Sequence, residues 1–388
     1  MANGEVERLV SENVSETVWL RLRRLTSAQL CAQLLHARPS SATADLIEKK
    51  SVGMSSAIRS ALGYWDAKEG GLNSKILSRY YALLQITIAE QISFLDNSDD
   101  LSAVQRHTEY GHGLFTIADA GLRFPQGYYL GCLRSGHFAA YLRSLDQNMA
   151  LYSHERRPRK FQDADRSKLV SLADLLRRVP ELQEVIKEYI GLEALSFQIA
   201  HDQRNFLERS GRMQAHAAKT GEVLMDPPSD TDIVKSYVAI FHRGAALTAE
   251  DFDGFGFEIK NLALAPANPA LHQHERFVGE VTHPKGTVWW NFVDTYKSGY
   301  SGTSLIVPLW GTRDPFVLHF AILYAFSIVV RYLPETWHSI EHGSLDNVRA
   351  LLEHYLVIVD NVLPHLAVER LTQKRLLVVH PGSMNAPV

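Results

Sequence analysis

The run from Phe316 to Val330, FVLHFAILYAFSIVV, constrains the fold of this chain more than any other segment. A helix that spans a membrane needs about 20 predominantly apolar residues. This run is shorter and contains His319 and Ser327. A helix that is apolar on all sides must be surrounded by protein. We therefore expect a buried core helix here, and a second central helix over 75–95, whose apolar residues also occupy every side.

The composition is that of a soluble globular protein. Hydrophobic residues make up 46% of the 388 residues and charged residues 21%, which excludes a mainly disordered chain or a rod. The formal net charge is −3, so we expect no specific nucleic-acid partner. Cys31 and Cys132 are too few for a disulfide framework, and the N-terminal sequence MANGEVERLV has no apolar core. Both observations favour a cytoplasmic protein.

Helical patterns dominate the two ends of the chain, and strand-like patterns dominate the middle. The turn-forming sequence DPPSD at 226–230 is followed by short segments rich in β-branched and aromatic residues. We therefore predict a mainly α protein with a β-rich insertion (α+β), in which a small antiparallel sheet near residues 233–310 accompanies a helical core. The predicted units are a helical region at 1–225, the β-rich insertion at 226–310, and C-terminal helices at 311–388 that pack back on the helical core.

Local patterns predict three further details. The spacing of apolar residues indicates a helix over 192–210. Residues 287–293 have the composition of a strand, and Lys285-Gly286 would join it to the preceding strand in a hairpin. Pro364 is expected to end the last helix, because proline lacks the N–H that continues the hydrogen-bond ladder.

The chain lacks the short motifs of common nucleotide-binding and hydrolytic sites. Neither GxxxxGK[ST] nor GxGxxG after a strand occurs, and Gly254-Phe255-Gly256 is followed by no helical pattern. Gly299-Tyr300-Ser301-Gly302 misses the spacing of GxSxG. We expect no cofactor and favour a protein without enzymatic activity, with two enzymatic alternatives left open.

The first alternative is a metal enzyme. His272 and His274 are two residues apart, so in an extended segment both rings would point to the same side, and His283 or Glu280 would complete a site. Pro266 and Pro269 instead favour an exposed loop with solvated histidines. We therefore expect no bound metal.

The second alternative is a ribonuclease toxin resembling the HEPN family, in which an arginine and a histidine separated by four to six residues act on a phosphodiester. The best pair is Arg106 with His112, followed by Arg349 with His354. Such pairs occur only slightly more often than the composition predicts. Glycines beside His112 disfavour a helix there, and a spacing of five places Arg349 and His354 on different helix faces.

Two segments have the composition of a contact surface. The connector at 153–168 is rich in basic residues, which attract anionic lipid or phosphate by about 1 kcal/mol each near a membrane surface. Two adjacent tryptophans in a strand would point to opposite faces, so one of them would be exposed. The predicted binding residues are Arg156, Arg157, Arg159, Lys160, Trp289 and Trp290.

Several motifs together resemble the bacterial YaaC-like proteins over about residues 55–370. They are Tyr80-Tyr81, His112-Gly113-Leu114, the segment from Arg331 to Trp337 (RYLPETW), and the stretch from Leu351 to Pro364. Physically these motifs have the character of a scaffold. The family has no established catalytic residues, so the resemblance assigns none.

The resemblance implies a role in immunity against phages. YaaC-like proteins have been linked to anti-phage defence, including a sensor component of the jumbo-phage killer system, which is understood to recognise an early membrane-bounded phage vesicle and to recruit an effector. For this chain the resemblance implies a non-enzymatic sensor or adaptor. The expected partners are a phage-derived vesicle or anionic membrane surface, an effector protein of the same defence system, and further copies of the chain in a homo-oligomer.

Overall fold

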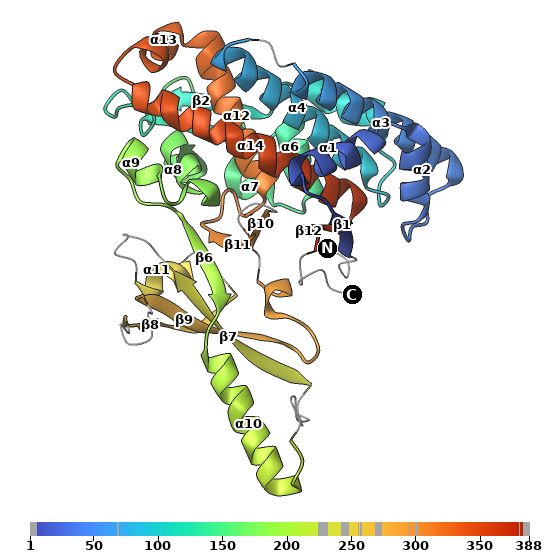
Figure 1. Cartoon of the computed structure of the whole chain (residues 1–388). Helices are drawn as coiled ribbons and strands as arrows, with labels where there is room; N and C mark the ends of the chain where they lie inside the picture. Colours follow the sequence, from blue (N-terminus) through green and yellow to red (C-terminus); the bar gives the residue numbers. More distant parts are fainter. Residues whose placement is uncertain are drawn as a thin grey trace.

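A computed structural model describes the chain except for residues 1–5, 68–69, 224–231, 242–247, 255, 257, 268–273, 294, 299–301, 380 and 383–388. Helices gather in one body, a six-stranded sheet lies beside it, and one long helix projects from the far side of that sheet (Figure 1). The predicted α+β fold with a helical core is confirmed.

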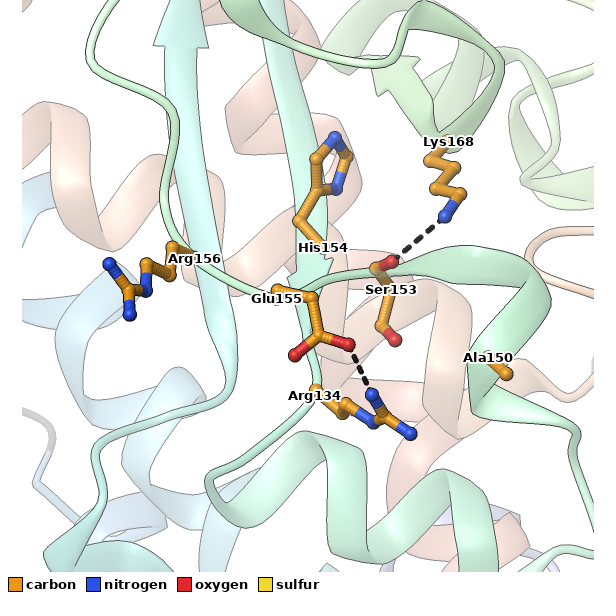
Figure 2. A pocket seen from close by; sticks show the side chains of 7 residues that line it. All are labelled: Arg134, Ala150, Ser153, His154, Glu155, Arg156 and Lys168. Carbon is orange, nitrogen blue, oxygen red and sulfur yellow. Dashed lines mark hydrogen bonds and ion pairs between the residues drawn. The ribbon is translucent and has the colours of Figure 1, made fainter.

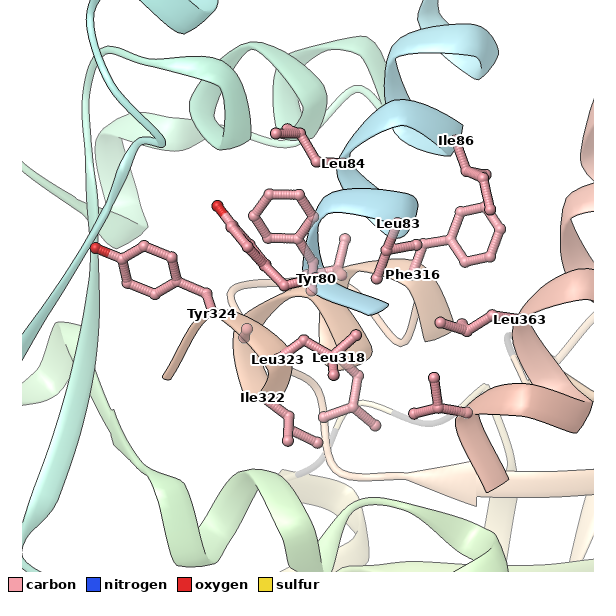
Figure 3. Packing of buried hydrophobic residues seen from close by; sticks show 14 of the residues in the cluster. Tyr80, Leu83, Leu84, Ile86, Phe316, Leu318, Ile322, Leu323, Tyr324 and Leu363 are labelled. Carbon is pink, nitrogen blue, oxygen red and sulfur yellow. The ribbon is translucent and has the colours of Figure 1, made fainter. Parts of the chain in front are cut away.

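The helical body holds the two central helices expected from the sequence, α4 and α12. Figure 3 shows Leu83 of α4 packed with Phe316, Leu318 and Leu323 of α12. The helices of this body are α1 (Val14–Arg24), α2 (Ala28–His36), α3 (Ala44–Trp65), α4 (Leu72–Ser93), α5 (Leu101–Glu109), α6 (His137–Ser144), α7 (Met149–Tyr152), α8 (Leu172–Arg177), α9 (Ile186–Ile190), α12 (Pro315–Tyr332), α13 (Pro334–His342) and α14 (Asp346–Thr372).

Two of these helices are long and apolar enough to cross a membrane by length and composition alone. They are α12 and α14, and 78% and 72% of their apolar windows are buried inside the protein. This burial is that of core helices, as expected for the run at 316–330.

Two small sheets belong to the same body. The first pairs β1 (Val6–Val10) with β12 (Arg375–Val379) in parallel, so that the two ends of the chain lie together. In the second, β3 lies between its neighbours and organises the sheet. Its strands are β2 (Leu114–Ala118), β3 (Tyr128–Leu133), β4 (Ser153–His154) and β5 (Leu169–Ser171), and short 3-10 helices η1 (Phe161–Asp163), η2 (Arg166–Lys168) and η3 (Pro180–Leu182) connect the chain around it.

The third sheet has the strand order β10-β11-β6-β7-β9-β8, with every neighbouring pair antiparallel. Its apolar cluster, which includes Phe197, Phe252 and Phe277, is separate from that of the helical body. The elements are β6 (Ser196–His201), α10 (Arg204–Thr220), β7 (Ile233–Phe241), α11 (Ala249–Gly254), β8 (Lys260–Ala265), β9 (Arg276–Pro284), η5 (Trp289–Asn291), β10 (Tyr296–Ser298) and β11 (Gly302–Ile306). Because β6 precedes residue 226, the sheet also uses chain from before the predicted insertion; the division into domains stays a prediction.

Three local predictions were wrong. The expected helix at 192–210 is β6 followed by the start of α10, because Phe197 and Ile199 alternate with exposed residues and fill the core of the sheet. The expected strand at 287–293 contains the 3-10 helix η5, which buries Trp289 beside β9. Pro364 lies inside α14, where buried neighbours such as Leu363 and Leu366 hold the helix in place on both sides of it.

A buried histidine joins the sheet to the helical body. The Nε2 atom of His319 on α12 lies 3.0 Å from the hydroxyl of Tyr296 on β10, and its Nδ1 atom lies 3.0 Å from the hydroxyl of Tyr355 on α14. Its burial lowers its pKa to about 3, and burial also lowers the pKa of His137 to about 3. Both rings are therefore neutral in the folded protein at pH values where the unfolded chain binds protons.

Acid is expected to destabilise the protein below about pH 6.5, the ordinary pKa of histidine. Each of His137 and His319 then lowers the free energy of unfolding by about 1.4 kcal/mol per pH unit, because the unfolded state binds one more proton. Urea unfolding at several pH values measures this slope. His319→Gln should reduce the slope by about one proton, whatever its effect on stability at pH 7; an unchanged slope would contradict the assignment.

Candidate functional site

A pocket of about 330 Å³ lies beside the basic connector at 153–168 (Figure 2). Strand β4 contributes Ser153 and His154 to the pocket wall. It is held in place by parallel pairing with β3. The turn after β3 contributes a cation from one side, and η2 contributes another. The lining residues are Arg134, Ala150, Ser153, His154, Glu155, Arg156 and Lys168.

Positive charge prevails in this pocket, which holds three cations and one carboxylate. Arg134 forms an ion pair with Glu155, and both side chains are mostly exposed. Lys168 donates from Nζ to the carbonyl oxygen of Ser153 at 3.1 Å. Arg156 is exposed at the rim. The excess of cations makes the pocket suitable for an anionic group.

His154 adds buried polar atoms to the wall of the pocket. Neither of its ring nitrogens has a well-formed hydrogen bond, although both are buried. Burial lowers the pKa of His154, and the charge of Lys168 lowers it further, against weaker opposing effects of Asp165 and the backbone. The ring is therefore held neutral beside the cations.

Of the predicted basic binding residues, Arg156 lines this pocket, and the others follow it along the chain. Arg156, Arg159 and Lys160 are exposed, and the exposed Arg157 donates to the carbonyl oxygen of Thr116 at 3.3 Å. The sequence did not predict that Arg134 and Lys168 line one pocket. Lys168 belongs to the charged connector that the sequence pointed to, whereas no pattern around Arg134 marked it. That these residues bind a ligand stays a prediction.

The two tryptophans do not form the expected exposed anchor on a strand. Trp289 is only 3% exposed and donates from its indole N–H to the imidazole of His201 at 3.1 Å. Trp290 is half-buried, with its ring 5.8 Å from that of His201. The 3-10 turn brings both rings to the same histidine, so they pack at the end of β6.

Two of the histidines proposed as metal ligands, His274 and His283, differ in burial. His272 is outside the described residues, and His274 is exposed. His283 is buried on β9, with Nε2 2.8 Å from the hydroxyl of Ser236 and Nδ1 3.1 Å from that of Thr287. Within the part of the chain that the structure describes, no group of three or more His, Cys, Asp or Glu side chains is arranged to hold a metal ion.

No interaction joins the members of either arginine–histidine pair, all four of which the structure describes. Arg106 is exposed on α5, and this helix ends at Glu109, before His112. Arg349 binds the carboxylate of Glu353 at 3.1 Å, whereas the ring of His354 contacts Tyr189. The geometry of these residues gives the ribonuclease alternative no support.

His112 instead belongs to a cluster that sequence reasoning missed, which we call the Tyr–His–Arg cluster (Tyr80, His112, Tyr324 and Arg331). The ring of Tyr80 lies 5.5 Å from that of His112 and 5.9 Å from that of Tyr324. The charge of Arg331 acts on all three rings. Three residues of the family-like motifs, Tyr80, His112 and Arg331, therefore lie in one cluster.

A family model described as YaaC-like Protein matches residues 24–371. Neither the curated proteins nor the solved structures gave a match. The matched segment covers the six-stranded sheet and the helical body from α2 to nearly the end of α14, including the basic pocket and the Tyr–His–Arg cluster. This chain belongs to the YaaC-like family.

Proposed function

We propose that the protein is a non-enzymatic, cytoplasmic sensor or adaptor of bacterial anti-phage defence. It recognises an early infection structure through that structure's anionic surface, such as the membrane of a phage-derived vesicle, and recruits an effector protein. Membership of the YaaC-like family supports the defence role. The observation that carries the recognition step is the basic surface at 156–160 together with the pocket beside it.

The basic surface suits a lipid headgroup. Arg156, Arg159 and Lys160 are exposed, and the adjoining pocket is open enough for a phosphate group between Arg134 and Lys168. Each basic residue near an anionic membrane contributes about 1 kcal/mol, so several residues acting together are needed for stable attachment. The attraction is electrostatic and therefore weakens as salt is added.

Helix α10 supplies a second surface, suited to the effector. None of its side chains, all of which the structure describes, is buried, and the helix projects away from the sheet (Figure 1). Phe206 and Leu207 are 71% and 61% exposed, and Arg212 and Lys219 are exposed further along. A helix that displays large apolar side chains to solvent is typical of a protein interaction site.

Co-sedimentation with vesicles tests the recognition step. Wild-type protein should bind vesicles that contain phosphatidylglycerol and should not bind vesicles of phosphatidylcholine alone, and added salt should release it. The triple variant Arg156→Glu, Arg157→Glu, Arg159→Glu should lose binding, because it replaces attraction by repulsion at the surface.

A matched variant controls for total charge. Arg212→Glu with Lys219→Glu also makes the protein more acidic, but on α10, and should leave vesicle binding in place. Equal binding to both kinds of vesicle, absence of binding by wild type, or equal loss in the two variants would contradict the proposal.

A further inference from the structure

The Tyr–His–Arg cluster contains buried polar atoms that the protein leaves without partners. Tyr80 is fully buried, and its hydroxyl has no hydrogen bond. The Nδ1 atom of His112 is also buried without a partner. Figure 3 shows the rings of Tyr80 and Tyr324, of which Tyr324 already donates its hydroxyl to the carbonyl oxygen of Leu114 at 2.8 Å. Buried hydroxyl and imidazole groups normally have a partner, so two unpaired groups in adjoining rings point to a group supplied from outside.

Arg331 supplies a charge to the same place. Its Nε atom donates to the carbonyl oxygen of Ser327 at 3.0 Å and its Nη2 atom to the hydroxyl of Ser327 at 3.1 Å, which fixes the guanidinium on α12. Its Nη1 atom lies 3.4 Å from the hydroxyl of Tyr81. Among the described residues no carboxylate forms an ion pair with Arg331. A half-buried cation without a counter-ion favours an anion.

The groups present select an anion that accepts several hydrogen bonds. A guanidinium only donates, and each Nη atom carries a second N–H beyond the contacts to Ser327 and Tyr81. The Tyr80 hydroxyl is a further donor, and His112 donates from Nδ1 in one of its two neutral tautomers. A tetrahedral phosphate offers enough oxygen atoms for all of these donors, and paired N–H groups of arginine bind it at two points.

The cluster comes nearest to solvent at Arg331 and His112. Arg331 and His112 are half-buried, whereas the ring of Tyr332 beside Arg331 is 63% exposed. The guanidinium of Arg331 lies 5.2 Å from the centre of that ring. The guanidinium end of the cluster is therefore the part that solvent reaches, whereas Tyr80 lies in the interior.

We propose that the Tyr–His–Arg cluster is a binding site for a phosphate group, with Arg331 as the anchor and Tyr80 and His112 as donors. This site is separate from the basic surface at 156–160 and goes beyond the proposed sensor function. The phosphate belongs to inorganic phosphate, to a glycerophosphate, or to a nucleoside monophosphate, which share this chemistry.

Calorimetric titration of the full chain with inorganic phosphate, glycerol 3-phosphate and a nucleoside 5′-monophosphate distinguishes these sources. Wild-type protein should bind at least one of the three. Arg331→Gln should weaken that binding by at least about tenfold, because a charged hydrogen-bond donor is lost. Vesicle binding should be unchanged in this variant, so failure of one proposal is not failure of the other.

Two tyrosine variants separate binding from structure. Tyr80→Phe should weaken phosphate binding severalfold without lowering the urea midpoint, because the hydroxyl has no partner in the protein. Tyr324→Phe is the matched control: it removes a hydroxyl that donates to the carbonyl oxygen of Leu114 at 2.8 Å, so its midpoint should fall. No binding to any of the three probes, wild-type affinity in Arg331→Gln, or a midpoint in Tyr80→Phe as low as in Tyr324→Phe would overturn the proposal.

Discussion

Replacement of Arg370 by methionine is expected to lower the free energy of unfolding by about 3–5 kcal/mol, the cost of breaking a buried ion pair from one side. Arg370 on α14 donates from Nη1 to Glu90 of α4 at 3.0 Å and pairs through Nη2 with Asp314, which caps α12. The side chains of Glu90 and Asp314 are only 6% and 12% exposed. Without Arg370, two carboxylates would remain buried with no cation between them.

The network around Arg370 joins three long helices of the core, α4, α12 and α14. The hydroxyl of Tyr141 donates to Glu90 at 2.7 Å and lies 3.1 Å from Arg370, so α6 is attached as well. Burial raises the pKa of Glu90, and the charge of Arg370 opposes that rise. Losing the arginine therefore favours protonation of the Glu90 carboxyl group and leaves Asp314 without its ion-pair partner.

Urea unfolding of the variant measures the effect, and a surface pair provides the control. Arg349 and Glu353 form an exposed ion pair on the same helix, so Arg349→Met should change stability by less than about 1 kcal/mol. Adding Glu90→Gln to Arg370→Met should restore part of the loss, because one buried charge is removed. Equal losses in Arg370→Met and Arg349→Met would contradict the assigned role of the network.

The sequence predicted the fold best where a long segment is apolar on every side. The apolar run at 316–330 and the central helix at 75–95 follow from the need to cover a helix that is apolar on every side. The strand β6 was missed because Leu192, Leu195 and Ile199 fit a helical spacing, while Phe197 and Ile199 fit the alternation of a strand, in so short a segment. Pro364 was misjudged because tertiary packing on both sides of it outweighs one lost hydrogen bond.

The residues of the candidate sites also fall into two groups. Some stand out in the local sequence, and others are brought together only by the fold. The basic connector is a local feature of charge, visible as Arg156, Arg157 and their neighbours. The Tyr–His–Arg cluster depends on segments such as Tyr81 and Arg331, which are 250 residues apart. Spacing along one sequence carries no information on such a meeting, and the motifs therefore had the character of scaffold alone.

Replacement of Gly136 by alanine is expected to cost more than about 3 kcal/mol, because strain and a backbone clash add together. Gly136 has φ of +100°, and an added Cβ would lie 2.5 Å from the backbone nitrogen of Gly113. This close approach lets the first turn of α6 hold the loop that carries His112. The N–H of His137 donates to the carbonyl oxygen of Gly111 at 3.0 Å, and that of Phe138 to the carbonyl oxygen of His112 at 3.0 Å.

Two other glycines separate the causes in urea unfolding. Gly191 also has a positive φ, +70°, but open space around its Cβ position, so Gly191→Ala should show strain alone, about 1–2 kcal/mol. Gly63 lies inside α3 with open space, and Gly63→Ala should stabilise the protein by about 0.5–1 kcal/mol. A cost for Gly136→Ala no greater than that for Gly191→Ala would show that the loop moves freely. His112 would then not be fixed against Tyr80 and Arg331, and the phosphate site would lose its preorganised donor.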